Sequence, residues 1–132
     1  MRRCTAILKS VNSQARVFVW SDMFDPYHNA VDKYYLVNGS LARSWDGLAR
    51  EVGIANWNEG NAAESLRFFA DRGHTQLIAG YYDGNDLRNF EHWDSAARGV
   101  KGVTGFMYTT WQSKYRLLER YGEAMRTEQS GK

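Results

Sequence analysis

The stretch Val17-Phe18-Val19-Trp20-Ser21-Asp22-Met23-Phe24-Asp25-Pro26 joins a short apolar run to a tryptophan, an acid and a proline turn. Valine and phenylalanine favour β-structure, and the polar residues that follow them end the run. The stretch therefore predicts a buried strand whose carboxyl end carries aromatic and polar side chains. Three later runs have the same form: Val52–Trp57, Gln76–Asp83 and Val103–Trp111. Four strands of this kind predict one face of the fold that is built to hold a ligand.

Helical patterns separate these strands. In residues 3–12, Cys4, Ile7, Leu8 and Val11 recur at helical spacing and form one apolar stripe. Strand starts near residues 17, 54, 76 and 103 alternate with the expected helices, and this alternation predicts an α/β fold with a parallel sheet and right-handed crossovers. The other expected helices are 62–71, 86–98 and 114–126, with a short one at 44–50.

The section from Tyr27 to Arg43 does not fit this alternation, because it is too long for an ordinary strand-to-helix connection. We expect either a hairpin or a functional loop there.

The length of 132 residues suits one domain with a real core, ending in a polar tail at about 127–132. A dinucleotide-binding fold is disfavoured, because no glycine-rich phosphate loop follows any strand. A (βα) barrel would place its ligand at the carboxyl ends of the strands, but a whole barrel has eight strands in about 250 residues. The sequence therefore predicts one (βα)4 domain over residues 1–132, half of a TIM barrel with its helices outside.

Composition argues against several classes of function. The net charge of +2, with no basic cluster beyond Arg2-Arg3, predicts no nucleic-acid partner. No run approaches the ~20 apolar residues of a membrane span, and no apolar signal-peptide core is seen, so we expect no membrane partner and a cytoplasmic location by default. The histidines His28, His74 and His92 are scattered and Cys4 is the only cysteine, so we expect no metal, no cofactor and no internal disulfide.

Trp20-Ser21-Asp22-Met23, Tyr81-Tyr82-Asp83 and the run Gly105–Trp111 occur in the order and spacing of three motifs of one enzyme family. They resemble the Trp-Asp-Asp-Met segment, the Tyr-Leu-Asp segment of the seventh strand and the eighth strand of the β-N-acetylhexosaminidases of glycoside hydrolase family 20. The eighth strand of that barrel ends in a tryptophan that stacks on the substrate. The resemblance covers nearly the whole chain, from the fourth helix of the barrel to the eighth.

This resemblance implies the C-terminal half of a family 20-like barrel that binds N-acetylhexosaminides. The family's catalytic Asp-Glu pair lies at the end of the fourth strand, before the point where this sequence starts. Ser113 also stands where family members often carry a glutamate. The resemblance therefore implies that the chain alone lacks the acid that protonates the leaving group.

Five aromatic residues at strand ends are candidates for substrate binding. Trp20, Trp57 and Trp111 would form a wall for the apolar face of a pyranose, or would instead cap the core. Tyr81 and Tyr82 alternate in direction, so only one of them can face the ligand. By resemblance, that tyrosine would hydrogen-bond a substrate acetamido group.

Asp22 and Asp83 are the candidate catalytic carboxylates, because both directly follow apolar strands, where partial burial can raise a pKa. As a pair they would suit an inverting glycosidase with carboxyl groups about 6.5–9.5 Å apart. Alternatively they cap loops. In family 20 chemistry the substrate's own acetamido oxygen is the nucleophile, and Asp83 would orient it. Further loop candidates are Asp25, His28 and Glu59.

Two open edges, at the first and fourth strands, and an inner face without a partner predict association. Val17, Val19, Ile54, Ile78 and Phe106 are the candidates to face the missing half of the core. We expect either a homodimer or a complementary N-terminal half-barrel to supply that half. The alternatives to a carbohydrate-binding half-barrel are a non-catalytic, self-associating module and a fragment of a larger glycoside hydrolase.

Overall fold

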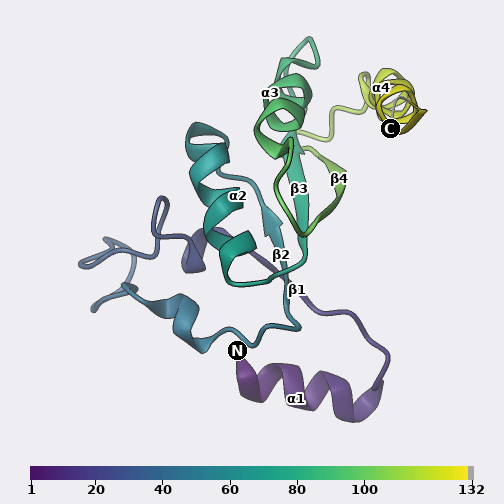
Figure 1. The fold of residues 1–132 in the computed structure, drawn as a ribbon. Coiled ribbons are helices and arrows are strands. Elements are labelled where there is room, and N and C mark those ends of the chain that lie inside the picture. The colour runs from purple at the N-terminus through teal and green to yellow at the C-terminus, as the bar shows by residue number, and fades with distance from the viewer. Residues whose placement is uncertain (131–132) are drawn as a thin grey trace.

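The chain folds around a four-stranded parallel sheet in the order β1-β2-β3-β4 (Figure 1). The computed structural model describes residues 1–130, with side chains as far as Thr127. Every neighbouring pair of strands is parallel, and each strand starts within about one residue of its predicted position. The predicted α/β class with a parallel sheet is therefore confirmed. The strands are β1 (Phe18–Trp20), β2 (Gly53–Asn56), β3 (Gln76–Tyr81) and β4 (Val103–Thr109).

The helices lie where the apolar periodicity predicts them, with shifts at their ends. They are α1 (Arg2–Val11), α2 (Ala62–Asp71), α3 (Arg88–Ala97) and α4 (Leu118–Ser130). The predicted tail is helical as far as Ser130, and residues 131–132 lie outside the described part. The short helix predicted for 44–50 is instead the single 3-10 turn η2 (Ser44–Gly47), and two further 3-10 turns are η1 (Asp22–Phe24) and η3 (Glu59–Asn61).

One face of the sheet is buried under α2 and α3, which lie side by side along β2 and β3 (Figure 1). Ile54 packs with Phe69 of α2, and Ile78 packs with Leu66 of α2 and Trp93 of α3. All five side chains are fully buried. Burial of these apolar side chains supplies the main favourable term that holds helices on the sheet.

The prediction of which strand residues face an open core is wrong for four of its five members. Val19, Ile54, Ile78 and Phe106 all pack into the clusters beneath the helices. Adjacent residues along a strand point to opposite faces, so a one-residue difference in register exchanges the two sets.

The opposite face of the sheet carries Phe18 and Trp20 of β1, Leu77 and Ala79 of β3, and Met107 of β4. A Cβ on Gly53 would lie only 2.3 Å from Cε1 of Phe18, which shows that the Phe18 ring lies across β2 on this face. We call this the open face, because the helices α2 and α3 pack on the other side.

The connection from β1 to β2 contains no α-helix and is anchored by a buried carboxylate. Asp25 is fully buried and accepts hydrogen bonds from Ser65 Oγ at 2.6 Å, from the Tyr27 amide at 2.9 Å and from Asn58 Nδ2 at 3.3 Å. These bonds tie the connection to α2 and to the segment after β2. A buried carboxylate needs such donors, because an unpaired buried charge is costly.

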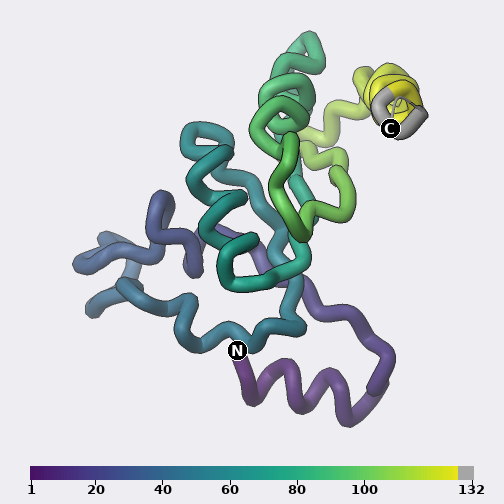
Figure 2. Tube along the Cα trace, viewed as in Figure 1, coloured from purple at the N-terminus to yellow at the C-terminus, as the bar shows by residue number. Residues whose placement is uncertain are grey.

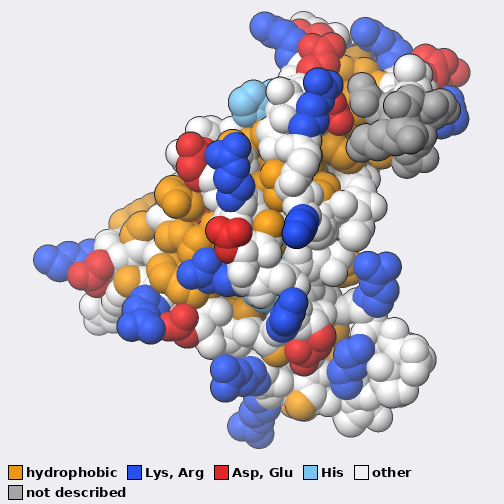
Figure 3. All heavy atoms as spheres, viewed as in Figure 1, with side chains coloured by type: hydrophobic (Ala, Val, Ile, Leu, Met, Phe, Trp, Pro, Cys, Tyr) orange, Lys and Arg blue, Asp and Glu red, His pale blue; other side chains and the backbone are white. Residues whose placement is uncertain are grey.

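Aromatic contacts extend this attachment along α2. Phe68 packs edge-on against Trp45 at 5.3 Å and against Tyr27 at 6.3 Å between ring centroids. Figure 3 shows hydrophobic side chains gathered in this region, with charged side chains around them. The 27–43 section therefore extends from the helix side of the molecule (Figure 2), and the open face is not covered by it.

Helix α1 lies apart from α2 and α3 (Figure 1), and its predicted apolar stripe faces outward. Ile7, Leu8 and Val11 are 57%, 50% and 86% exposed, and Thr5 is the buried residue of this helix. The predicted helix is thus confirmed, but its apolar stripe does not pack into the core.

This packing predicts that two truncations to alanine, one in the core and one on the exposed stripe of α1, differ greatly in their effect on the free energy of unfolding. Phe69→Ala should lower the free energy of unfolding by about 3–5 kcal/mol, because the ring is fully buried and leaves a cavity. Val11→Ala, on the exposed stripe, should change it by less than about 0.5 kcal/mol. Urea unfolding followed by circular dichroism measures both, and equal effects of the two changes would contradict this assignment of the core.

Candidate functional site

A cavity of about 440 Å³ lies where the four strands end. Trp20 is the last residue of β1 and Tyr81 is the last residue of β3, while Trp57 follows β2 and Trp111 follows β4. Four of the five predicted substrate-binding aromatics therefore line one cavity, although up to 91 residues separate them in the sequence. The other lining residues are Glu59, Ala79, Asn89, Met107, Tyr108, Thr109, Thr110 and Tyr115.

The aromatic rings of this cavity are unusually accessible. Trp111 is 74% exposed, Trp20 50% and Tyr81 43%. Trp57 is half-buried, with its ring centroid 6.3 Å from that of Trp111 and 4.9 Å from that of His28. Trp57 therefore packs against His28 and also lines the cavity. Clustered exposed aromatics of this kind mark binding surfaces.

Tyr82 points the other way. Its side chain is fully buried, and its ring stacks on Tyr108 at 4.7 Å and contacts Tyr121 at 4.8 Å. Burial, together with Tyr121, Glu59 and Tyr108, raises the pKa of Tyr82 far above its usual value, so the hydroxyl stays neutral. Of the two tyrosines, Tyr81 is the one that faces the cavity.

Asp83 holds the loop that carries Trp111. It is 5% exposed and accepts hydrogen bonds from the Trp111 amide at 2.7 Å, from the Gln112 amide at 3.1 Å and from the Thr110 hydroxyl. Burial raises the pKa of Asp83, but these bonds and one from Tyr81 outweigh it and lower the pKa below its ordinary value. The group is therefore an ionised acceptor whose oxygens are occupied, which is an arrangement for positioning.

Asp22 lies in η1, where its carboxylate accepts a hydrogen bond from Asn29 Nδ2 at 3.4 Å. Neither Asp22 nor Asp83 lines the aromatic cavity, so the structure does not bring the two together around a ligand. Their role as a catalytic pair stays a prediction.

Glu59 is the carboxylate that does line the cavity. It is exposed at the first position of η3, two residues after Trp57, and its carboxylate has no hydrogen-bond partner among the described residues. The sequence marks it only as one loop acid among several, because its position depends on where the chain turns after β2. Asn89, in contrast, is a lining residue that sequence reasoning missed: its Oδ1 accepts a hydrogen bond from the Tyr81 amide at 3.1 Å.

Among the side chains that the structure describes, no group of three histidine, cysteine or acidic residues is arranged to hold a metal ion. In the same part of the chain, no helix is long and apolar enough to cross a membrane.

Comparisons of the chain with protein-family models, with curated proteins and with solved structures found no match. Its function is therefore inferred from the geometry of the site and from the motifs in its sequence.

The hydrogen bonds that Asp83 accepts from the loop after β4 predict a pH-dependent contribution to thermal stability. The pKa of Asp83 is lower in the folded protein than in the unfolded chain, where it is about 4. The carboxylate therefore stabilises the folded state fully above about pH 4, and this contribution is lost as the pH falls through the pKa of the folded protein. Asp83→Asn should therefore lower Tm at pH 7, and its difference from wild type should shrink below about pH 4. Thermal melts at several pH values test this, with exposed Asp71→Asn as the control. A difference that widens in acid would contradict the assignment.

Proposed function

We propose that this protein binds carbohydrate at the aromatic cavity, with N-acetylhexosaminides as the ligand class. The observation that carries the proposal is the group of accessible rings, Trp20, Tyr81 and Trp111, around a cavity of about 440 Å³. That volume falls in the usual range for small-molecule sites. Flat aromatic faces complement the C–H face of a pyranose, and burial of that face is favourable.

Polar groups at the rim supply the hydrogen bonds that a sugar needs. Asn89 and Glu59 line the same cavity and offer amide and carboxylate atoms, whereas the Thr110 hydroxyl, also in the lining, is bonded to Asp83 and to the Lys114 amide. The similarity of Tyr81-Tyr82-Asp83 and of the run ending in Trp111 to family 20 motifs supports the acetamido sugars in particular. In this proposal Asp83 acts through Trp111, as a positioning residue.

We propose that the chain binds its ligand without hydrolysing it by itself. A free general acid is needed to protonate the leaving group, and it typically contributes ~10²–10⁴-fold to the rate. Neither predicted catalytic carboxylate is a free acid at the site, because the oxygens of Asp83 are occupied by hydrogen bonds and Asp22 lies outside the cavity lining. Glu59, the carboxylate that lines the cavity, has no second carboxylate beside it in that lining. A complementary N-terminal half-barrel would supply the acid that the resemblance implies, whereas a second copy of this chain would not.

We further propose that the sheet is half of a TIM barrel, completed by a second copy of the chain. Three features support this: β1 and β4 are sheet edges, the open face carries the apolar side chains Phe18, Leu77 and Met107, and helix α1 exposes its apolar stripe. Unpaired parallel edges invite further strands, and β1 of one copy can pair with β4 of the other around a two-fold axis. A complementary N-terminal half-barrel is the other partner that would fit these edges.

The carbohydrate proposal predicts weak binding that depends on Trp111. N-acetylglucosamine, titrated to tens of millimolar, should perturb tryptophan fluorescence and give ligand-observed NMR transfer signals. Trp111→Ala should weaken binding by about three- to tenfold, the value of one lost aromatic contact. Trp45→Phe is the matched control, because Trp45 packs on Phe68 away from the cavity. Unchanged spectra across the titration would remove the carbohydrate proposal.

The assembly proposal predicts a particle of about twice the 15.2 kDa chain mass in sedimentation at micromolar concentration. Leu77→Glu should shift it to the monomer, because Leu77 lies on the open face and a buried unpaired charge is costly. Arg67→Glu, on the exposed side of α2, should leave the mass unchanged. A wild-type monomer with cooperative unfolding would overturn the homodimer and leave the complementary half-barrel as the partner to test.

A further inference from the structure

A second cavity, of about 410 Å³, lies at the opposite end of β4 from the aromatic cavity. It is lined by the first half of β4, by the last turn of α3 with the loop that follows it, and by Met125 of α4. The two linings have no described residue in common. This cavity is therefore a separate place on the molecule, and its volume is in the usual range for small-molecule sites.

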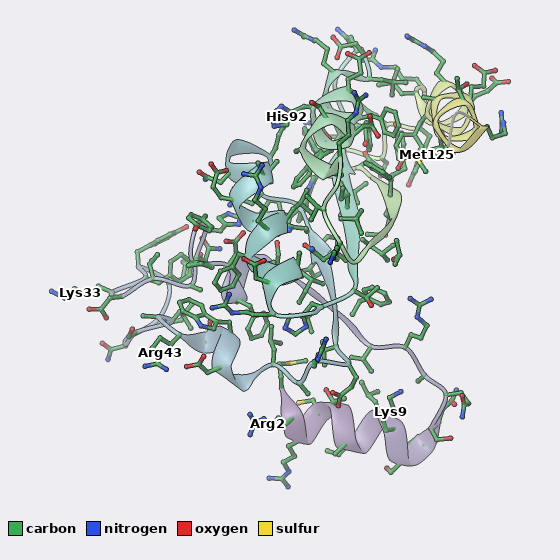
Figure 4. All side chains as sticks on the ribbon, in the orientation of Figure 1. Arg2, Lys9, Lys33, Arg43, His92 and Met125 are labelled. Carbon is green, nitrogen blue, oxygen red and sulfur yellow. The ribbon has the colours of Figure 1, made fainter. Side chains whose placement is uncertain are left out.

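Much of this cavity is lined by apolar side chains. The rings of Phe90 and Phe106 lie 5.3 Å apart between centroids, and Phe106 is only half-buried. Met125 packs against the cluster that contains Phe90, and Figure 4 shows it on the side of α4 that faces β4. The apolar body of a ligand would bury these surfaces, which is favourable. The apolar members of the lining are Phe90, Ala97, Val100, Val103, Phe106 and Met125.

An irregularity in β4 shapes the cavity wall. The strand pairs with β3 through Gln76 and Val103 and next through Leu77 and Gly105, so Thr104 is an extra residue in the ladder. Its hydroxyl donates a hydrogen bond to the Gln76 carbonyl oxygen at 3.2 Å. Val103, Thr104 and Gly105 all line the cavity. Bulges of this kind re-aim side chains and are over-represented beside functional sites.

A carboxylate gives the cavity its charge. Asp94 lines the cavity and is buried, and its Oδ2 accepts a hydrogen bond from Arg98 Nη2 at 3.1 Å. The Arg98 side chain is 72% exposed, and an ion pair with such an exposed partner contributes little. A second cation that reaches Asp94 from within the cavity can therefore compete with Arg98.

The carboxyl end of α3 has the same sign of charge. The last turn of this helix reads Asp94-Ser95-Ala96-Ala97, with an acid and no base. Carbonyl groups at the carboxyl end of a helix carry partial negative charge and favour cations, so an acid in the last turn has the unfavourable sign for the helix dipole. The carboxylate and the helix end together favour a positive charge in this cavity.

We propose that this cavity binds a small organic cation, with an ammonium group beside Asp94 and an apolar body of about the size of a phenyl ring against Phe90 and Phe106. An inorganic cation would gain nothing from the apolar lining, and one carboxylate is too few ligands to hold it. An ammonium group placed near aromatic rings gains further attraction from their faces. This inference is independent of the proposed carbohydrate site.

The test titrates three probes that share a phenyl ring and differ in charge into the full chain at pH 7. They are 2-phenylethylamine, which is cationic, 2-phenylethanol, which is neutral, and phenylacetate, which is anionic. Binding is followed by NMR shifts of the Gly99 and Val100 amides, which belong to residues of the lining. The amine should bind about three- to tenfold more tightly than the alcohol, the value of one charge-assisted hydrogen bond less the competition from Arg98. Phenylacetate should bind more weakly than the alcohol.

Two variants should change the preference for the amine in opposite directions. Asp94→Asn keeps the shape and removes the charge, so the amine should bind no more tightly than the alcohol. Arg98→Gln removes the competing cation, so the amine should bind about two- to fivefold more tightly while the alcohol is unchanged. Loss of a merely structural contact would not strengthen binding. Glu91→Gln, exposed on the same helix and outside the lining, is the matched control.

Three results would overturn the inference. The first is equal affinity for the three probes, and the second is a preference for the amine that survives in Asp94→Asn. The third is a response confined to the Trp111 indole, which would place the probes in the aromatic cavity. Arg98→Gln alters a mostly exposed side chain, so it keeps the test decisive if Asp94→Asn folds poorly. None of these results bears on carbohydrate binding.

Discussion

Alternation along four parallel strands is the constraint on which the rest of this structure depends. Successive side chains point to opposite faces of a sheet, so Ile54 and Ile78 cannot be buried beneath the helices without sending Ala55 and Ala79 to the open face. The same rule separates Tyr81, which lines the cavity, from Tyr82, which is buried among Tyr108 and Tyr121. Parallel pairing then brings all four strand ends together. Side-chain alternation and parallel pairing together place the aromatic residues at one edge of the sheet, where the cavity lies.

Two buried carboxylates at strand ends stabilise the loops around this cavity. Asp25 receives donors from the segments after β1 and β2 and from α2, and Asp83 receives three donors from the loop that follows β4. Loops at strand ends present amide groups that no ladder satisfies, and an ionised carboxylate can accept several of them. An acid directly after an apolar strand is therefore as well suited to clamping a loop as to catalysis. Glu59, which has no such donors among the described residues, remains available to a ligand.

The site and the open face belong to the same side of the sheet. Trp20, Ala79 and Met107 follow the alternation of the open face and line the cavity at its carboxyl end. Any partner that covers the open face would therefore also add a wall to the cavity. This arrangement links the proposed half-barrel closure to the proposed carbohydrate site, and it explains why the cavity aromatics are so accessible in a single chain.

The sequence by itself determined the parallel α/β class, the positions of the strands and main helices, and four of the six aromatics that line the cavity, because hydrophobic periodicity and turn residues are local signals. Only the tertiary structure decided which face of the sheet is open, and Val19, Ile54, Ile78 and Phe106 lie under the helices, against expectation. Register depends on pairing between strands that are distant in sequence. The roles of Asp83 and Glu59 were decided in the same way. Both are acids after strands, but the folded chain buries Asp83 and brings it three donors, whereas Glu59 is exposed and lines the cavity.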